Sequence, residues 1–179
     1  MPTVDVTRTY LELKTPGQLR PARDPDVLLR LEQVRECVPS LYRFLYGTVG
    51  AQYHWVDRRG WTDEQIRTHV GQPEITLWVL YRGTDHAGYF ELARQPDGSV
   101  EIAYFGLFPD YVGRGLGKHM LTLAVEQAWA LGAGRVWLHT CTLDHAAALP
   151  NYLKRGFVPF KTEVYQATTP PVNHQGTSV

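Results

Sequence analysis

The residues Val100–Leu131 read VEIAYFGLFPDYVGRGLGKHMLTLAVEQAWAL, and this stretch predicts a strand, a glycine-rich turn and a helix. Val100–Leu107 is apolar and rich in β-forming residues, as is typical of a mostly buried strand. After the turn, apolar side chains recur at helical spacing and give the helix one apolar face: Leu116, Met120, Leu123, Ala124 and Ala128. The fold is therefore expected to be organised around a strand that enters a helix through glycine.

The glycines of this turn favour a ligand that binds the main chain. Gly113, Gly115 and Gly117 alternate along the turn, so no side chain at these positions keeps a ligand away. Several N–H groups can then point into one concavity at the positive end of the helix dipole, which suits a diphosphate. The alternative is a glycine-rich helix start that binds no ligand.

The spacing excludes two common nucleotide motifs. A P-loop has one more residue before its Gly-Lys pair and a Ser or Thr after it, whereas His119 follows Lys118 here. A dinucleotide fingerprint needs a final glycine where Lys118 stands. A nucleotide-dependent kinase is therefore disfavoured.

The same residues resemble the pyrophosphate loop of the GNAT superfamily of acyl-CoA N-acyltransferases. That loop reads Arg/Gln-x-x-Gly-x-Gly/Ala after a strand that often ends in an apolar-x-Pro step, and it matches Leu107–Pro109 and Val112–Gly117. One departure is Val112, which occupies the Arg/Gln position. The resemblance implies acetyl-CoA as co-substrate and no metal. Arg114 and Lys118 are expected to help neutralise the phosphate charge, which is compatible with their being solvated cations of the loop. The residues that it implies for binding are Phe105, Gly106, Leu107, Val112, Gly113, Arg114, Gly115, Leu116, Gly117, Lys118 and His145.

A second stretch matches the superfamily's late Asn-x-x-Ala…Tyr-x-x-x-Gly-Phe pattern. Tyr152–Phe157 matches its end and Ala148 its alanine, but His145 stands at the asparagine. Because of this departure, the sequence does not decide whether His145 makes the side-chain contact to the pantetheine arm that is usual in the family. Tyr152 lies at the family's general-acid position, where a phenol donates to the departing sulfur; the alternative is a tyrosine that only packs on the cofactor.

Glu101 is the main candidate for the catalytic base. Its spacing from the glycine loop resembles that of histone-type GNAT enzymes, whose catalytic glutamate lies here. A carboxylate in an apolar strand should have a raised pKa, which suits a base near neutrality. The alternative is a glutamate at the start of the strand facing water, and Glu91 and His139 are rival bases. In the family, backbone groups at Phe105–Leu107 hold the pantetheine and the carbonyl, and Gly106 is expected to mark a bulge where strands part.

Composition indicates an ordinary globular domain. The chain has 179 residues, 44% of them hydrophobic and 20% charged, with 18 basic and 18 acidic residues. This balance suggests neither a nucleic-acid nor a membrane partner. Cys37 and Cys141 are too few for a disulfide framework and are expected to be reduced. We expect a cytoplasmic protein with a single domain over residues 1–166 and a flexible tail over residues 167–179.

The order of predicted elements favours an α/β (α+β) fold with a mixed, mostly antiparallel central sheet and helices on both faces, as in the GNAT fold. Besides the central strand and helix, the predicted elements are strands at 3–13, 75–81, 86–93, 135–141 and 157–166, and helices at 26–38, 41–46, from 62 to near 71, and 144–155. Pro150 would kink the last helix or make it begin late. The three strands before the central helix should form an antiparallel meander.

The resemblance implies an N-acetyltransferase in which a primary amine attacks acetyl-CoA directly within a ternary complex. The alternative is a non-catalytic acyl-CoA sensor on the same fold. The acceptor is expected to be a small-molecule or peptide amine, and a homodimer is compatible with the sequence. An acceptor pocket or simple helix packing would explain the aromatic residues Tyr42, Phe44, Tyr46, Tyr53, Trp55 and Trp61.

Overall fold

A computed structural model of the chain describes residues 3–168. This part contains one seven-stranded sheet with the order β2-β3-β4-β5-β6-β1-β7. The strands are β1 (Thr3–Leu13), β2 (Leu29–Val34), β3 (Ile75–Arg82), β4 (Asp85–Arg94), β5 (Val100–Leu107), β6 (Val136–Cys141) and β7 (Val158–Thr168). All neighbouring strands are antiparallel except β5 and β6, which confirms the expected mixed sheet.

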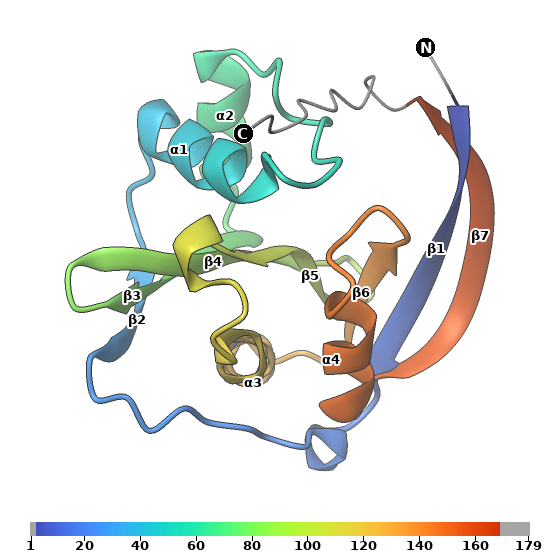
Figure 1. Ribbon diagram of the computed structural model, residues 1–179. Coiled ribbons are helices and arrows are strands. Elements are labelled where there is room, and N and C mark those ends of the chain that lie inside the picture. The colour runs from blue at the N-terminus through green and yellow to red at the C-terminus, as the bar shows by residue number, and fades with distance from the viewer. Residues whose placement is uncertain (1–2, 169–179) are drawn as a thin grey trace, which may run out of the picture.

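Helices cover both faces of the sheet, as expected. They are α1 (Pro39–Gly50), α2 (Asp63–Val70), α3 (Leu116–Ala130) and α4 (Ala148–Lys154). In Figure 1, α1 and α2 lie above the sheet, while α3, seen end-on, and α4 lie below it. The core lies mainly between α3 and the sheet, and its fully buried side chains include Phe90, Leu92, Met120, Leu121 and Val125. This packing holds the start of α3 against the end of β5.

The first strand completes the far half of the sheet. β1 lies between β6 and β7 and is antiparallel to both, with Tyr10 opposite His139 on one side and Lys161 on the other. Figure 1 shows β1 and β7 curving together away from the helical layer. The N-terminal strand therefore holds two C-terminal strands in place, a long-range pairing that no local sequence pattern indicates.

Several predicted elements are confirmed. β1 and β5 have the predicted bounds, and β3, β4 and β5 form the antiparallel meander. The capping box at the start of α2 is also present. Thr62 Oγ1 accepts from Gln65 N at 3.2 Å, and Gln65 Oε1 accepts from Thr62 N at 2.8 Å. Local capping and alternation therefore located these elements correctly.

The predicted helix over residues 26–38 is wrong. This segment contains the edge strand β2, which pairs with β3. Two side chains of the expected apolar helix face, Val27 and Val38, are 93% and 58% exposed. Pairing with a strand more than forty residues away therefore overrides the local apolar spacing. Pro39, expected to end that helix, instead occupies the first position of α1, where its missing N–H costs nothing.

Two other helix boundaries differ from the prediction. The short helix expected over residues 41–46, stopped by Gly47 and Gly50, spans Pro39–Gly50 as α1, so Gly47 does not end it. The helix expected from Asp144 begins late, at Ala148, with Pro150 in its first turn, so the late start is confirmed. Asp144 is not its N-cap, because its carboxylate accepts from Thr140 Oγ1 at 2.7 Å and Cys141 N at 2.9 Å.

The last strand extends beyond its predicted end at Gln166. β7 continues to Thr168, so the first two residues of the predicted tail over 167–179 belong to the sheet. The remainder of that predicted tail lies outside the described residues.

Candidate active site

The sheet opens between β5 and β6. These strands are paired only through Val100 with Val136 and Glu101 with Trp137. Past Glu101, the edge of β5 that faces β6 has no strand partner among residues 3–168 as far as Leu107. Main-chain N–H and C=O groups on such an edge can bind an extended ligand. The resemblance places the pantetheine arm at this opening.

The bulge in β5 lies at Ala103, which has no partner on β4. The predicted bulge at Gly106 is wrong, because Gly106 pairs with Tyr89. A different constraint explains the glycine: a Cβ at Gly106 would lie 2.4 Å from Val49 Cγ1 on α1. The close approach of α1 to the strand therefore requires glycine there.

The glycine loop is open where side chains would otherwise stand. Gly113 and Gly115 have φ angles of 80° and 77°, the left-handed region that favours glycine. A Cβ at Gly113 would meet no atom within 4 Å, and one at Gly115 would meet only Lys118 Cε, at 3.9 Å. A Cβ at Gly117 would lie 3.5 Å from Asn151 Nδ2. The loop thus forms a concavity that side chains leave free.

Main-chain donors surround this concavity. Among residues 3–168, the amides of Gly113–Gly115 donate no main-chain hydrogen bond, whereas the amide of Val112 donates to Pro109 O at 3.3 Å. α3 begins at Leu116, and the first N–H groups of a helix have no partner within it. Free amides at the positive end of a 15-residue helix fit a diphosphate, so the residues present fit coenzyme A.

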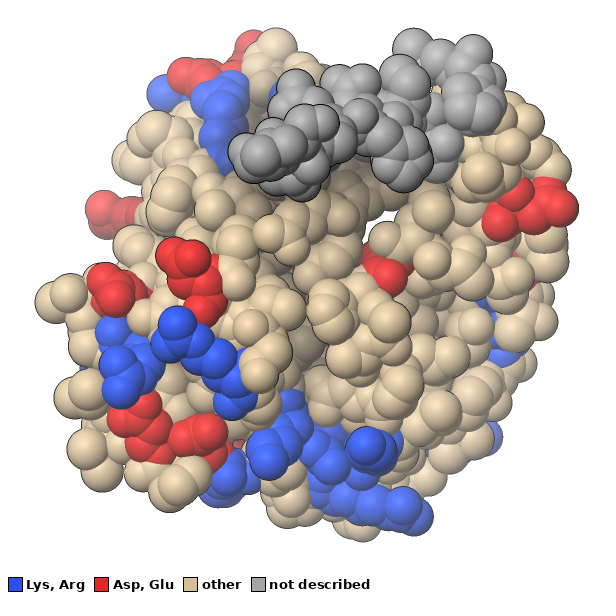
Figure 2. All heavy atoms as spheres, in the orientation of Figure 1, with Lys and Arg blue, Asp and Glu red and all other residues tan. Residues whose placement is uncertain are grey.

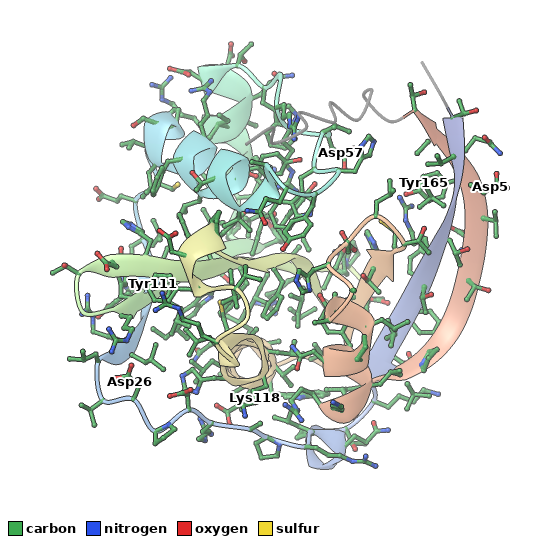
Figure 3. The ribbon with its side chains drawn as sticks, viewed as in Figure 1. Asp5, Asp26, Asp57, Tyr111, Lys118 and Tyr165 are labelled. Atoms are coloured by element: carbon green, nitrogen blue, oxygen red, sulfur yellow. The ribbon has the colours of Figure 1, made fainter. Side chains whose placement is uncertain are left out.

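Positive side chains lie near the loop. The Arg114 guanidinium stacks 5.0 Å from the Tyr111 ring centroid, and Figure 3 shows Lys118 beside α3 with Tyr111 above it. In Figure 2, Lys and Arg side chains gather around the lower end of α4. Leu116 differs from its neighbours, because its side chain is buried and only its main chain is near the loop. The local charge therefore complements an anion.

Tyr152 lies on α4 beside the opening. The residue is only 7% exposed, and its ring centroid lies 6.2 Å from that of Phe105 and 6.1 Å from that of Phe157. Burial raises the pKa of the Tyr152 phenol well above its ordinary value, and the nearby Asp144 carboxylate raises it further. The phenol is therefore protonated at neutral pH and able to donate.

Glu101 and His139 lie together at the mouth of the opening. Their closest atoms, Oε1 and Nε2, are 3.8 Å apart, and Gln95 Nε2 donates to Glu101 Oε2 at 3.3 Å. Burial raises the pKa of the Glu101 carboxyl, and the Glu91 carboxylate adds to this shift. Burial lowers the pKa of His139 and Arg8 lowers it further, so the imidazole is neutral at neutral pH. Both groups can accept a proton.

Glu91, the third candidate base, is held in a different environment. Its side chain is 1% exposed and accepts from Arg58 Nη1 and His69 Nε2, each at 2.8 Å, and from Tyr42 OH at 3.4 Å. Burial alone would raise its pKa, but the hydrogen bonds and charges of His69 and Arg58 hold the pKa below its ordinary value. Glu91 therefore holds α1, α2 and the loop between these two helices against β4.

The predicted aromatic group divides into core and loop residues. Tyr42 and Tyr46 are buried in α1, so helix packing explains them. Phe44 is 45% exposed, and Trp61 stacks on Tyr42 and on Arg58. Tyr53 and Trp55 lie on the loop over residues 51–62. The Tyr53 ring contacts that of His145, beyond β6, and the Trp55 ring contacts that of Tyr104 on β5.

Two residues near the opening and the glycine loop, His145 and Asn151, make contacts that the sequence did not predict. His145 Nδ1 accepts from Ala147 N at 3.0 Å, so one ring nitrogen serves the local turn. Asn151 faces the first turn of α3, as its distance from a Cβ at Gly117 indicates. Its place directly before Tyr152 in the motif was the signal available in the sequence. Arg58, the partner of Glu91, gave no such signal, because its partners are distant in sequence.

Among the described residues, no group of three or more His, Cys, Asp or Glu side chains is placed to hold a metal ion. None of the helices in that same part of the chain is long and apolar enough to span a membrane.

Comparison with protein families gives one match over most of the chain. A family described as “Acetyltransferase (GNAT) family” matches residues 39–157. A search of curated proteins found no match.

Solved structures share the fold. A GCN5-related N-acetyltransferase from Kribbella flavida is 19% identical, with a TM-score of 0.65 over 92% of this chain and 58% of that chain. A GCN5-related N-acetyltransferase from Sphaerobacter thermophilus is 20% identical, with a TM-score of 0.62 over 93% of this chain and 52% of that chain. The Bacillus subtilis acetyltransferase in complex with CoA is 23% identical, with a TM-score of 0.54 over 72% of this chain and 75% of that chain. This chain spans 52% to 65% of the length of four of the matched structures.

Proposed function

The chain belongs to the acetyltransferase (GNAT) family, and on that premise we propose that it transfers an acetyl group from acetyl-CoA to a primary amine. The observation that carries this proposal is the glycine loop at the start of α3, which lies directly after the unpaired end of β5. Diphosphate and pantetheine sites are thereby adjacent, as a single extended thioester requires. Bound acetyl-CoA would supply the activated acyl group.

The base in this proposal is Glu101, assisted by His139. An amine arrives mainly as an ammonium ion, so a proton must leave before its nitrogen can attack. The raised pKa of Glu101 makes its carboxylate a better proton acceptor than an exposed one. His139, 3.8 Å away, provides a neutral imidazole that can pass the proton on to solvent.

Tyr152 would act as the acid. When the new C–N bond forms and the C–S bond breaks, the thiolate needs a proton, and the buried phenol can donate one. Unpaired main-chain N–H groups on β5 would stabilise the negative charge that develops on the carbonyl oxygen. Both substrates must be bound together, because the amine attacks directly in this mechanism.

The acceptor would approach from the face that carries β1 and the loop over residues 51–62. Figure 3 shows Asp57 on this loop and Tyr165 on β7 at opposite sides of the approach, and in Figure 2 the surface is open between these parts. We infer a primary amine on a small molecule or peptide as the acceptor class.

Two measurements test the proposal. Calorimetry with CoA and acetyl-CoA tests binding, and thiol release from acetyl-CoA with a panel of primary amines tests catalysis. We expect binding and amine-dependent release. Binding without release on any amine would instead support the acyl-CoA sensor, and a protein that binds neither compound would refute both functions.

A further inference from the structure

We propose that Trp55 restricts the acyl donor to short chains, with acetyl favoured over longer acyl groups. This inference rests on the proposed function, because it concerns the acyl end of the same site. No sequence motif assigns a role to Trp55, which lies on the loop between α1 and α2.

The indole covers the α1 side of the unpaired β5 edge. Its atoms Cη2 and Cζ2 lie 3.5 Å and 3.8 Å from where a Cβ on Gly106 would stand. These atoms belong to the six-membered ring, so that ring lies closest to the strand. Val49 Cγ1 fills the rest of the space on this side, at 2.4 Å from the same point. Little room remains above Gly106.

Several rings hold the indole in this position. The Trp55 centroid lies 4.9 Å from that of Tyr104, 5.6 Å from that of Tyr46 and 6.2 Å from that of Tyr89. Gly50 contributes from the end of α1, because a Cβ there would lie 2.7 Å from Trp55 Cβ. A side chain packed in this way does not move aside without losing several contacts.

The two faces of β5 define the direction of the acyl chain. Successive residues of a strand face opposite sides, and Phe105 packs on Tyr152 whereas Tyr104 and Gly106 face Trp55. With Tyr152 placed to protonate sulfur on one side, the acyl carbons extend toward the other. An acetyl methyl fits beneath the indole, but each further methylene must displace aromatic side chains.

The test measures binding of CoA, acetyl-CoA, butyryl-CoA and hexanoyl-CoA by calorimetry. For the wild type we expect affinity to fall by about tenfold or more from acetyl-CoA to hexanoyl-CoA. In Trp55→Ala the order should reverse, because each buried methylene can then contribute about fourfold to affinity. In Trp55→Phe, which lacks the outer part of the indole, the chain-length preference should lie between those of the wild type and Trp55→Ala. This variant also provides the test if Trp55→Ala does not fold.

Trp129→Ala is the matched control, since this partly buried tryptophan lies near the far end of α3 and should leave the chain-length preference unchanged. Equal wild-type affinity for acetyl-CoA and hexanoyl-CoA would overturn the inference, as would an unchanged preference in folded Trp55 variants. These outcomes leave the proposed function intact. Failure of the wild type to bind every one of these compounds would instead remove the proposed function and this inference with it.

Discussion

Glu101 Oε1 and His139 Nε2 lie 3.8 Å apart, where Glu101 forms the last pair that joins β5 to β6 and His139 lies two residues beyond its partner Trp137. Burial shifts the two pKa values in opposite directions, upward for the carboxyl and downward for the imidazole. Burial thus makes Glu101 a stronger base and favours the neutral form of His139. This pairing at the mouth of the opening gives the proton of the acceptor amine a path toward solvent.

Glu101→Gln should lower kcat by about 100-fold or more, because the amide keeps the size of the side chain but accepts no proton. The residual activity should lose the acid limb that protonation of Glu101 imposes on the wild-type pH profile. His139→Gln should cost less than Glu101→Gln, since the carboxylate remains. Steady-state kinetics over a range of pH would measure both effects. A Glu101→Gln variant with unchanged kcat would assign the base elsewhere.

Glu101→Gln should also increase the free energy of unfolding at neutral pH. A raised folded-state pKa means that the native protein binds more protons at Glu101 than the unfolded chain does. The ionised Glu101 carboxylate therefore destabilises the folded protein. This destabilisation is absent below the ordinary pKa of the carboxyl and grows as pH rises through the raised pKa of the folded state. Urea unfolding of the wild type and Glu101→Gln across this range should diverge with increasing pH. Parallel curves would contradict the assigned shift.

Gly117→Asp should abolish CoA binding by placing a negative side chain in the diphosphate concavity. Gly117 is a sharper target than Gly115, where the positive φ would also strain any side chain. The matched control is Gly117→Ala, whose Cβ would lie in ordinary contact with Asn151 Nδ2 at 3.5 Å. Calorimetry on the folded variants measures the difference. Wild-type affinity in Gly117→Asp would refute the assigned diphosphate site.

Local signals account for the elements that were predicted correctly. The strand ending at Leu107 and the helix beginning at Leu116 could be located because glycine, proline and apolar spacing act within a few residues. The strand β2 could not, because its apolar residues also fit a helix and its partner β3 begins more than forty residues later. The same limit applies to β1, whose place between β6 and β7 depends on the whole fold.

The candidate site follows the same division. Gly113–Gly117, Tyr152 and Glu101 could be proposed from the sequence because motif and spacing indicate their chemistry, and their roles stay predictions. The environment of Glu91 could not be predicted, since its partner Arg58 lies 33 residues away and bonds to Tyr42, a further 16 residues from Arg58. Glu91 is therefore better explained as part of a buried ion network than as a base.

Tyr152→Phe should lower kcat by about 100-fold while changing the Kd for CoA only slightly, because phenylalanine keeps the ring packing and loses only the proton donor. Tyr53→Phe is a suitable control, since it removes a different, partly buried phenol from the same region. Stopped-flow thiol release and calorimetry separate the two effects. Equal losses in turnover and affinity for Tyr152→Phe would assign the side chain to packing on the cofactor.

The ion pair between Arg58 and Glu91 should contribute more to stability than exposed ion pairs do. Their side chains are only 12% and 1% exposed. Glu91→Gln or Arg58→Met alone should therefore cost about 3–5 kcal/mol, because each leaves a buried charge without its partner in this ion pair. The double variant should cost much less than the sum, since neither charge then remains. Urea unfolding of all four proteins completes this double-mutant cycle.

The pH dependence provides an independent check on this pair. Because the pKa of Glu91 is lowered on folding, its contribution is fully present above the ordinary carboxyl value and is lost as pH falls through the lowered one. Stability of the wild type should therefore fall toward acid pH more steeply than that of the double variant, which lacks this carboxyl. Additive single effects, together with parallel acid limbs, would mean that the pair is screened by water despite its burial.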